Sequence, residues 1–155
     1  MPSSIPAARA NLRSLLTTAF VAQTNVLVYY GKTLGSYVSP ITVQITGWTG
    51  DQQPAELGPS YRREETYAIN MDITSWAGDQ DYATREVEVM AAFGTVSLVV
   101  ANNWTLPSTA GGNDGAVRFA EVGTFNFVPE ADDNGQSMGK LLFDVHCSQR
   151  ITSLT

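Results

Sequence analysis

The chain has one histidine and one cysteine, His146 and Cys147, and the two are adjacent. They lie in a segment whose alternation of apolar and polar residues predicts a strand. Their side chains should therefore point to opposite faces and cannot form a nucleophile–base pair. Asp144 should share the face of His146, and a carboxylate that orients an imidazole forms half of a catalytic triad. Because no Gly-x-Ser-x-Gly turn or equivalent accompanies this pair, the pattern favours a structural or solvent-exposed His146.

Metal and phosphate sites have little support in the sequence. One histidine and one cysteine exclude a multi-histidine centre within one subunit, a cysteine-rich zinc site and an intramolecular disulfide. The run Asp132-Asp133-Asn134-Gly135 offers oxygen ligands, but it lacks the spacing and the glutamate of a calcium loop and is typical of a hairpin turn. The glycine-rich segment 111–115 has no Lys-Ser/Thr and does not open a helix. We therefore expect no catalytic, cofactor or metal site.

Charge is sparse and acidic in this 155-residue chain. It has 9 Lys and Arg against 15 Asp and Glu, a formal net charge of -6 and a charged fraction of 15%, below the roughly 25% of an average protein. The absence of a Lys/Arg cluster argues against binding to duplex nucleic acid, which requires several phosphate contacts. No apolar run approaches the roughly 18 residues of a membrane span, and the N-terminus lacks a secretory pattern. We therefore expect a soluble protein without a membrane partner.

The first half of the chain predicts one helix followed by three strands. Apolar residues at helical spacing predict a helix from a Ser3-Ser4 cap to about residues 23–25. A β-branched and aromatic run predicts a strand over 26–30, and strict alternation predicts strands over 41–46 and 66–74. The segment 47–59, with three glycines and two prolines, is expected to be a loop.

The second half predicts one helix followed by two strands. The helix should begin at Asp79 or Asp81, acidic residues suited to a helix N-terminus, and end near residues 102–103. Strands are expected over about 117–128, with a bulge near Gly123, and over about 138–147. The apolar stripe of the helix is expected to comprise Ala83, Val87, Met90, Ala91, Gly94 and Leu98.

These elements predict the fold class. The order α-β-β-β-α-β-β is typical of an α+β protein with a mainly antiparallel sheet and both helices packed on one face. No internal repeat and no βαβ alternation occurs. The length is that of one ordinary domain, so we expect a single domain over residues 1–155.

The remaining distinctive residues are typical of a protein interface. Side chains of the types that anchor such contacts occur in the predicted loop 48–58, in the charged run after it and in aromatics of loops or strand ends, namely Trp48, Tyr61, Trp76 and Trp104. A turn is expected over 129–136. The alternative is that the aromatic side chains cover the core and that the charged side chains form a solvated cluster. The residues that we expect at an interface are Trp48, Asp51, Gln52, Arg62, Arg63, Glu64, Glu130, Asp132 and Asp133.

Short motifs along the chain resemble, in type and order, those of the tail terminator proteins of long-tailed bacteriophages. After an N-terminal amphipathic helix, the segments that carry the resemblance are Val28–Gly31, Gly50–Gly58, Arg62–Tyr67, Asp81–Glu86, Val117–Val122 and Phe143–Cys147. The second of these reads Gly-Asp-Gln-x-Pro-Ala-x-Leu-Gly, and the third reads Arg-Arg-Glu-Glu-x-Tyr. The resemblance covers nearly the whole chain.

The resemblance implies a function that composition does not supply. Proteins of this family form a ring, typically of six subunits, on the end of a completed tail tube, stop its polymerisation and present the surface that joins the head. The implied partners are further copies of this chain, the tail tube protein and a head-side connector protein. DNA would pass through the lumen without specific binding. The protein would be a virion component assembled in the host cytoplasm, not an enzyme, and would need no cofactor.

Other interpretations stay open at the level of the residues. Another neck component, such as a head-completion or stopper protein, would bind the portal assembly rather than the tail tube. A small ligand-binding or enzymatic α+β domain would need a pocket that holds Asp144 and His146 with a third polar group. A monomeric adaptor would be recognised by its sedimentation.

Overall fold

The computed structural model describes residues 3–31, 41–56, 62–77, 81–131 and 137–152. Within these residues the order of elements is α-β-β-β-α-β-β, as the sequence predicts. The helices are α1 (Ile5–Ala19) and α2 (Tyr82–Asn102). The strands are β1 (Val26–Tyr30), β2 (Ile41–Glu56), β3 (Arg62–Ala77), β4 (Phe119–Ala131) and β5 (Ser137–Thr152).

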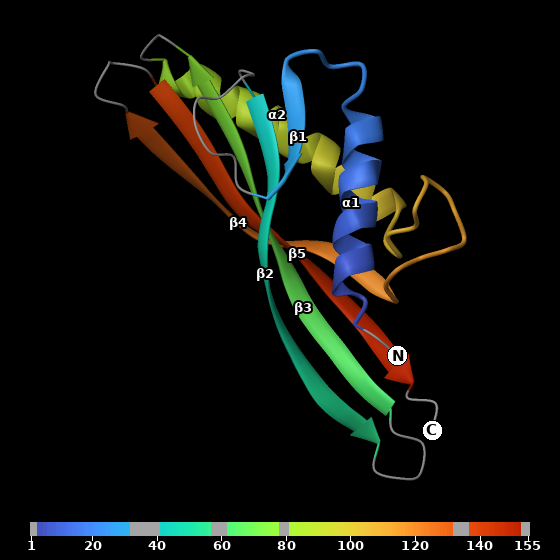
Figure 1. Ribbon diagram of the computed structural model, residues 1–155. Helices are drawn as coiled ribbons and strands as arrows, with labels where there is room; N and C mark the ends of the chain where they lie inside the picture. The colour runs from blue at the N-terminus through green and yellow to red at the C-terminus, as the bar shows by residue number, and fades with distance from the viewer. Residues whose placement is uncertain (1–2, 32–40, 57–61, 78–80, 132–136, 153–155) are drawn as a thin grey trace.

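The five described strands form one sheet in the order β1-β2-β3-β5-β4. Only β1 and β2 run parallel, and the other neighbours are antiparallel. Both helices pack on the same face of this twisted sheet, and β2, β3 and β5 continue beyond the amino end of α1 (Figure 1). The predicted α+β class, with a mainly antiparallel sheet backed by helices, is confirmed.

The core lies between the helices and the sheet face that they cover. Alternate residues of β3 and β5 point into it, as the period-2 pattern predicts. The Phe93 ring of α2 packs at 5.0 Å between centroids against both Phe143 of β5 and Phe125 of β4. Fully buried core residues include Leu12, Leu16, Ile45, Ile69, Ile73, Val89, Val96, Leu141 and Val145.

The predicted loop over 47–59 is wrong for most of its length, because β2 continues through Glu56. The pairing with β3 shifts register between Ile45 and Trp48, so Gly47 lies in a bulge. Strand β1 pairs with β2 only as far as Ile45. Beyond that residue β2 is an edge strand among the described residues, and edge strands tolerate proline. The residues that indicate a loop are therefore tolerated in this strand.

The predicted inward stripe of α2 is also wrong. Its members Val87 and Leu98 are 69% and 62% exposed. The opposite face is buried instead, namely Arg85, Val89, Ala92, Phe93, Val96 and Val100. Because α2 is apolar on nearly all sides, the sequence offers two stripes, and the one with phenylalanine and β-branched residues packs on the sheet.

The other boundaries follow the expectations with small differences. The bulge near Gly123 is confirmed by a register shift between Val122 and Phe125. Helix α1 ends at Ala19, a few residues earlier than expected. Strands β4 and β5 extend into the predicted turn and past Cys147. Residues 132–136, and with them Asp132 and Asp133, lie outside the described part of the chain.

Candidate interaction surface

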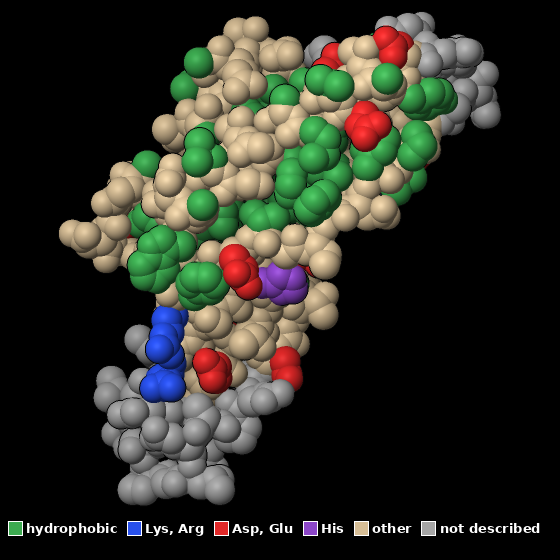
Figure 2. All heavy atoms as spheres, turned by 180° about the vertical axis from the view of Figure 1, so that it is seen from behind, with side chains coloured by type: hydrophobic (Ala, Val, Ile, Leu, Met, Phe, Trp, Pro, Cys, Tyr) green, Lys and Arg blue, Asp and Glu red, His purple; other side chains and the backbone are tan. Residues whose placement is uncertain are grey.

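His146 and Cys147 point to opposite faces of β5, as expected. Cys147 is buried on the helix-covered face, and burial raises the pKa of its thiol to about 12. His146 is exposed on the helix-free face, directly opposite Glu121 of β4. Its imidazole packs over Gly123, where a Cβ atom would lie only 2.2 Å from the ring. Figure 2 shows this histidine in purple beside an acidic side chain.

The helix-free face around His146 is hollowed but carries no assembled triad. The hollow has a volume of about 560 Å³, and its lining includes Asp51, Glu121 and Ser148. Asp144 is on the same face two residues before His146, yet no hydrogen bond joins their described side chains. Among the described residues, no group of three or more His, Cys, Asp and Glu side chains could hold a metal ion.

The most deeply buried carboxylate, Glu65 of β3, fixes the start of α1. It is only 1% exposed, and it accepts hydrogen bonds of 2.9 to 3.0 Å from the Ser3 hydroxyl and from the backbone N–H and hydroxyl of Ser4. The Ser4 hydroxyl also lies 3.0 Å from the Tyr67 hydroxyl, and burial raises the pKa of that phenol. Because these donors precede α1, the carboxylate takes the place of a helix cap and holds α1 on the sheet.

A second buried ionic group holds α2. The Arg85 side chain is packed beneath the helix, with its Nη2 atom 3.3 Å from Oε1 of Glu88. The Ser75 hydroxyl of β3 donates a hydrogen bond to the other carboxylate oxygen of Glu88. Gly139 of β5 makes room for this arrangement, since a Cβ atom there would lie 2.9 Å from the Arg85 Cβ. The positions of Arg85 and Glu88 are therefore accounted for by the packing of α2 against the sheet.

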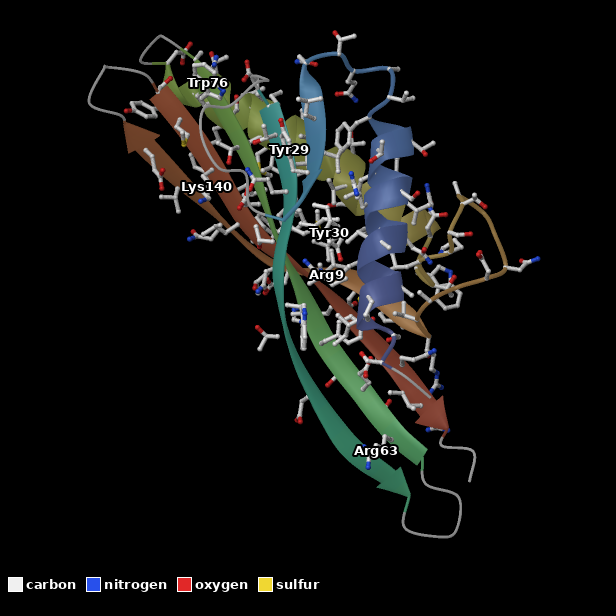
Figure 3. The ribbon with its side chains drawn as sticks, viewed as in Figure 1. Arg9, Tyr29, Tyr30, Arg63, Trp76 and Lys140 are labelled. Atoms are coloured by element: carbon white, nitrogen blue, oxygen red, sulfur yellow. The ribbon has the colours of Figure 1, made fainter. Side chains whose placement is uncertain are left out.

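The predicted interface residues lie at two opposite ends of the sheet. Asp51, Arg63 and Glu64 belong to the end where β2, β3 and β5 outrun α1, and Arg63 is labelled there in Figure 3. Half-exposed Trp48 lies nearer the core, opposite Ile69 on the helix-covered face.

At the other end of the sheet, Glu130 is exposed near the end of β4. The backbones of Gln52 and Arg62 pair within the sheet, but their side chains lie outside the description. The structure therefore does not bring the predicted interface residues together into one patch.

A further exposed apolar region contains none of the nine interface residues expected from the sequence. Its groove, between α2 and the outermost strand β4, has a volume of about 710 Å³. The Trp104 and Phe119 rings pack against each other at its end, with centroids 6.3 Å apart. Figure 2 shows hydrophobic side chains gathered across this face. We name as the α2–β4 surface the exposed side chains Val87, Met90, Leu98, Trp104, Phe119 and Phe125.

A smaller hollow lies at the opposite edge of the sheet, between α1 and β1. Arg9 stacks over the Tyr30 ring at 4.6 Å and its Nη2 donates to the Thr46 carbonyl, while Arg13 lies 5.8 Å from the same ring. Figure 3 shows Arg9 and Tyr30 between the two elements. The hollow has a volume of about 530 Å³. We name as the α1–β1 edge its lining residues Ala10, Arg13, Ser14, Thr17, Thr18 and Tyr30.

Comparisons with protein families and curated proteins do not assign a function to this chain, so its function is inferred from its own residues. Models of known protein families give no match to the chain. The curated proteins likewise include none with a significant sequence match. In the described residues, neither helix has the length and apolar character required to cross a membrane.

Proposed function

We propose that this protein is a self-assembling structural component of a phage virion, specifically a tail terminator. The observation that supports this most directly is the exposed α2–β4 surface on the outermost strand of the sheet. Contiguous apolar surface of this kind marks a site of protein contact. Five of its six members are aromatic, valine or leucine side chains, and aromatic residues are the ones enriched in interface centres.

The shape of the chain suits a closed ring. The sheet ends in two different edge strands, β1 and β4, each with its own helix beside it. A contact between unlike edges is heterologous, and repeated rotation about one axis closes such contacts into a ring. The motifs resembling tail terminators supply the specific assignment, a ring of about six copies on the end of a tail tube.

The two ends of the sheet suit two different axial partners. The predicted polar contact residues lie at both ends. Glu64 belongs to the end that extends beyond α1, and Glu130 belongs to the end at the β4–β5 pair. In a ring whose copies meet edge to edge, these ends would face opposite openings. One would contact the tail tube protein and the other a head-side connector protein. An acidic chain also suits a lumen through which DNA passes without being bound.

Electron microscopy of the purified protein, alone and mixed with isolated tail tubes, tests this proposal. We expect rings in the protein alone and caps on one end of the tubes. Added to polymerising tube protein, the ring should also stop elongation. Rings that bind portal assemblies and ignore tubes would indicate the other neck component. A persistent monomer that leaves tubes uncapped would contradict the proposal altogether.

A further inference from the structure

The two edges of the chain differ in a way that identifies the contact between copies. We infer that the α2–β4 surface of one copy binds the α1–β1 edge of the next copy. This inference rests on the proposed ring, and it assigns the surfaces from which that ring would be built. The partner is thus a second copy of this chain, presented by its first helix and first strand.

Side-chain size is complementary between the two surfaces. The outward residues Val87 and Leu98 project from α2, and Ala91, Gly94 and Ala101 complete an exposed stripe at alternating spacings of four and three. This spacing keeps one seam of a helix facing a partner. The α1–β1 edge instead presents a hollow lined mainly by small side chains, Ala10, Ser14, Thr17 and Thr18. Large side chains on one copy therefore meet small ones on the other.

Charge is complementary as well. Helix α1 and strand β1 contain two arginines, Arg9 and Arg13, and no acidic residue. The exposed charged side chains within α2 and β4 are all acidic, namely Glu86, Glu121 and Glu130, while the exposed Arg118 directly precedes Phe119 at the start of β4. Opposite charges at the rim of an apolar contact direct association and fix its register.

Charge also argues against pairing of like edges. Two α2–β4 surfaces in a twofold contact would bring their glutamates together, and two α1–β1 edges would bring their arginines together. Such juxtapositions of like charge are unfavourable. The unlike pairing avoids both, and it is the one that leads to a ring instead of a closed dimer.

Two single variants, each damaging one surface, test the assignment by sedimentation. Leu98→Lys places a cation in the apolar stripe of α2, and Arg13→Glu reverses the charge of the opposite surface. Leu98→Lys should raise the concentration required for ring formation by about 100-fold, because a buried leucine contributes about a hundredfold in affinity. Arg13→Glu should raise it too, because the new carboxylate repels the acidic rim of the neighbour. Leu142→Lys is the matched control, since Leu142 is exposed on the helix-free face and should leave the ring intact.

Mixing the two variants gives the sharpest result. Each variant keeps one intact surface, and the two substitutions place opposite charges on the other two surfaces, so an equimolar mixture should associate into dimers or larger species while each variant alone stays monomeric. A mixture that stays monomeric, or rings that persist in either variant, would overturn the assignment. Ser14→Trp, which fills the hollow without changing charge, provides a second test of the α1–β1 edge. Unfolding midpoints close to that of the unaltered protein establish that the variants fold.

The outcome for the unaltered protein separates this inference from the proposed function. If the unaltered protein forms rings that cap tubes, and the variants do so equally well, only the assignment of the surfaces is wrong. If the unaltered protein remains a monomer and leaves tubes uncapped, both the inference and the proposed function are wrong.

Discussion

The two helices lie in one layer on one face of the sheet, yet their outward faces differ. Helix α1 buries an apolar stripe and exposes small or polar residues such as Ala10, Ser14 and Thr17. Helix α2 also buries an apolar stripe, but it exposes a second one that includes Val87 and Leu98. A helix that only covers a core needs one apolar stripe. The second stripe of α2 is the part of the helix that we propose to contact a second copy of the chain.

The largest expected effect compares leucines on the two helices. Leu12 of α1 is fully buried and Leu98 of α2 is 62% exposed. Leu12→Ala should lower the free energy of unfolding by about 2–5 kcal/mol, because it leaves a cavity in the core. Leu98→Ala should change it by less than about 0.5 kcal/mol in the monomer. Urea unfolding at low protein concentration measures both, and similar losses would contradict the difference between the helices.

The next effect concerns the attachment of α1. Glu65→Gln removes the charge that accepts hydrogen bonds from Ser3 and Ser4, and it should cost about 1–3 kcal/mol. Its neighbour Glu64 is only half-buried, so Glu64→Gln should cost little. Hydrogen exchange should show α1 opening more readily in the first variant while α2 keeps its protection. Equal loosening of both helices would refute a local anchor.

Alkaline pH should lower the free energy of unfolding, because it favours ionisation of a thiol that is buried between the helices and the sheet. Burial raises the pKa of Cys147 from 9.0 to about 12 in the folded state. The stability from keeping this thiol neutral is therefore complete below about pH 9 and is lost as the pH rises toward 12. By pH 10 the loss should be about 1 kcal/mol. Cys147→Ala should remove this part of the slope, leaving the part due to Tyr67, whose pKa is raised as well. A slope unchanged in the variant would contradict the assignment to Cys147.

The smallest expected effect is at the start of α2. The Asp81 carboxylate accepts hydrogen bonds from the hydroxyl and the backbone N–H of Thr84, and these lower its pKa below the ordinary value of 3.8. This contribution to stability is present above about pH 4 and is lost as the pH falls below it. Asp81→Ala should lower the melting temperature slightly at neutral pH. The difference from the unaltered protein should shrink in acid, whereas Asp81→Asn should retain most of the cap.

Regular alternation made much of the fold predictable. The buried positions of β3 and β5 follow the period-2 pattern, and Gly123 marks a bulge because a strand interior seldom has a glycine. The same pattern could have identified Glu65, which shares a face with Tyr67 and Ile69. The glycines and prolines of 47–59 predict a loop, but β2 continues to Glu56 because the open edge of this strand tolerates them. Nothing in the sequence of α2 alone decides which of its two apolar stripes faces the sheet.

The candidate surface was harder to predict than the fold. The sequence favours contacts in loops, whereas the α2–β4 surface lies mainly on a helix and an edge strand. That surface includes the face of α2 that does not pack on the sheet. Its position therefore depends on the tertiary arrangement and cannot be read from the sequence of the helix. Polar residues such as Asp51 and Glu130 are exposed as expected, but the structure sets them at opposite ends of the sheet.

The continuation of β2, β3 and β5 beyond α1 has a mechanical consequence. Within the described residues this part of the sheet is not backed by a helix (Figure 1), so it is held chiefly by hydrogen bonds between its strands. This part of the sheet should be stiff near Glu65, where the start of α1 is attached, and more flexible toward its free end near Arg63. If the chains form a ring, these flexible sheet ends can bend together and change the diameter of the ring opening. A ring built from this chain could thus grip a tube that does not match it perfectly.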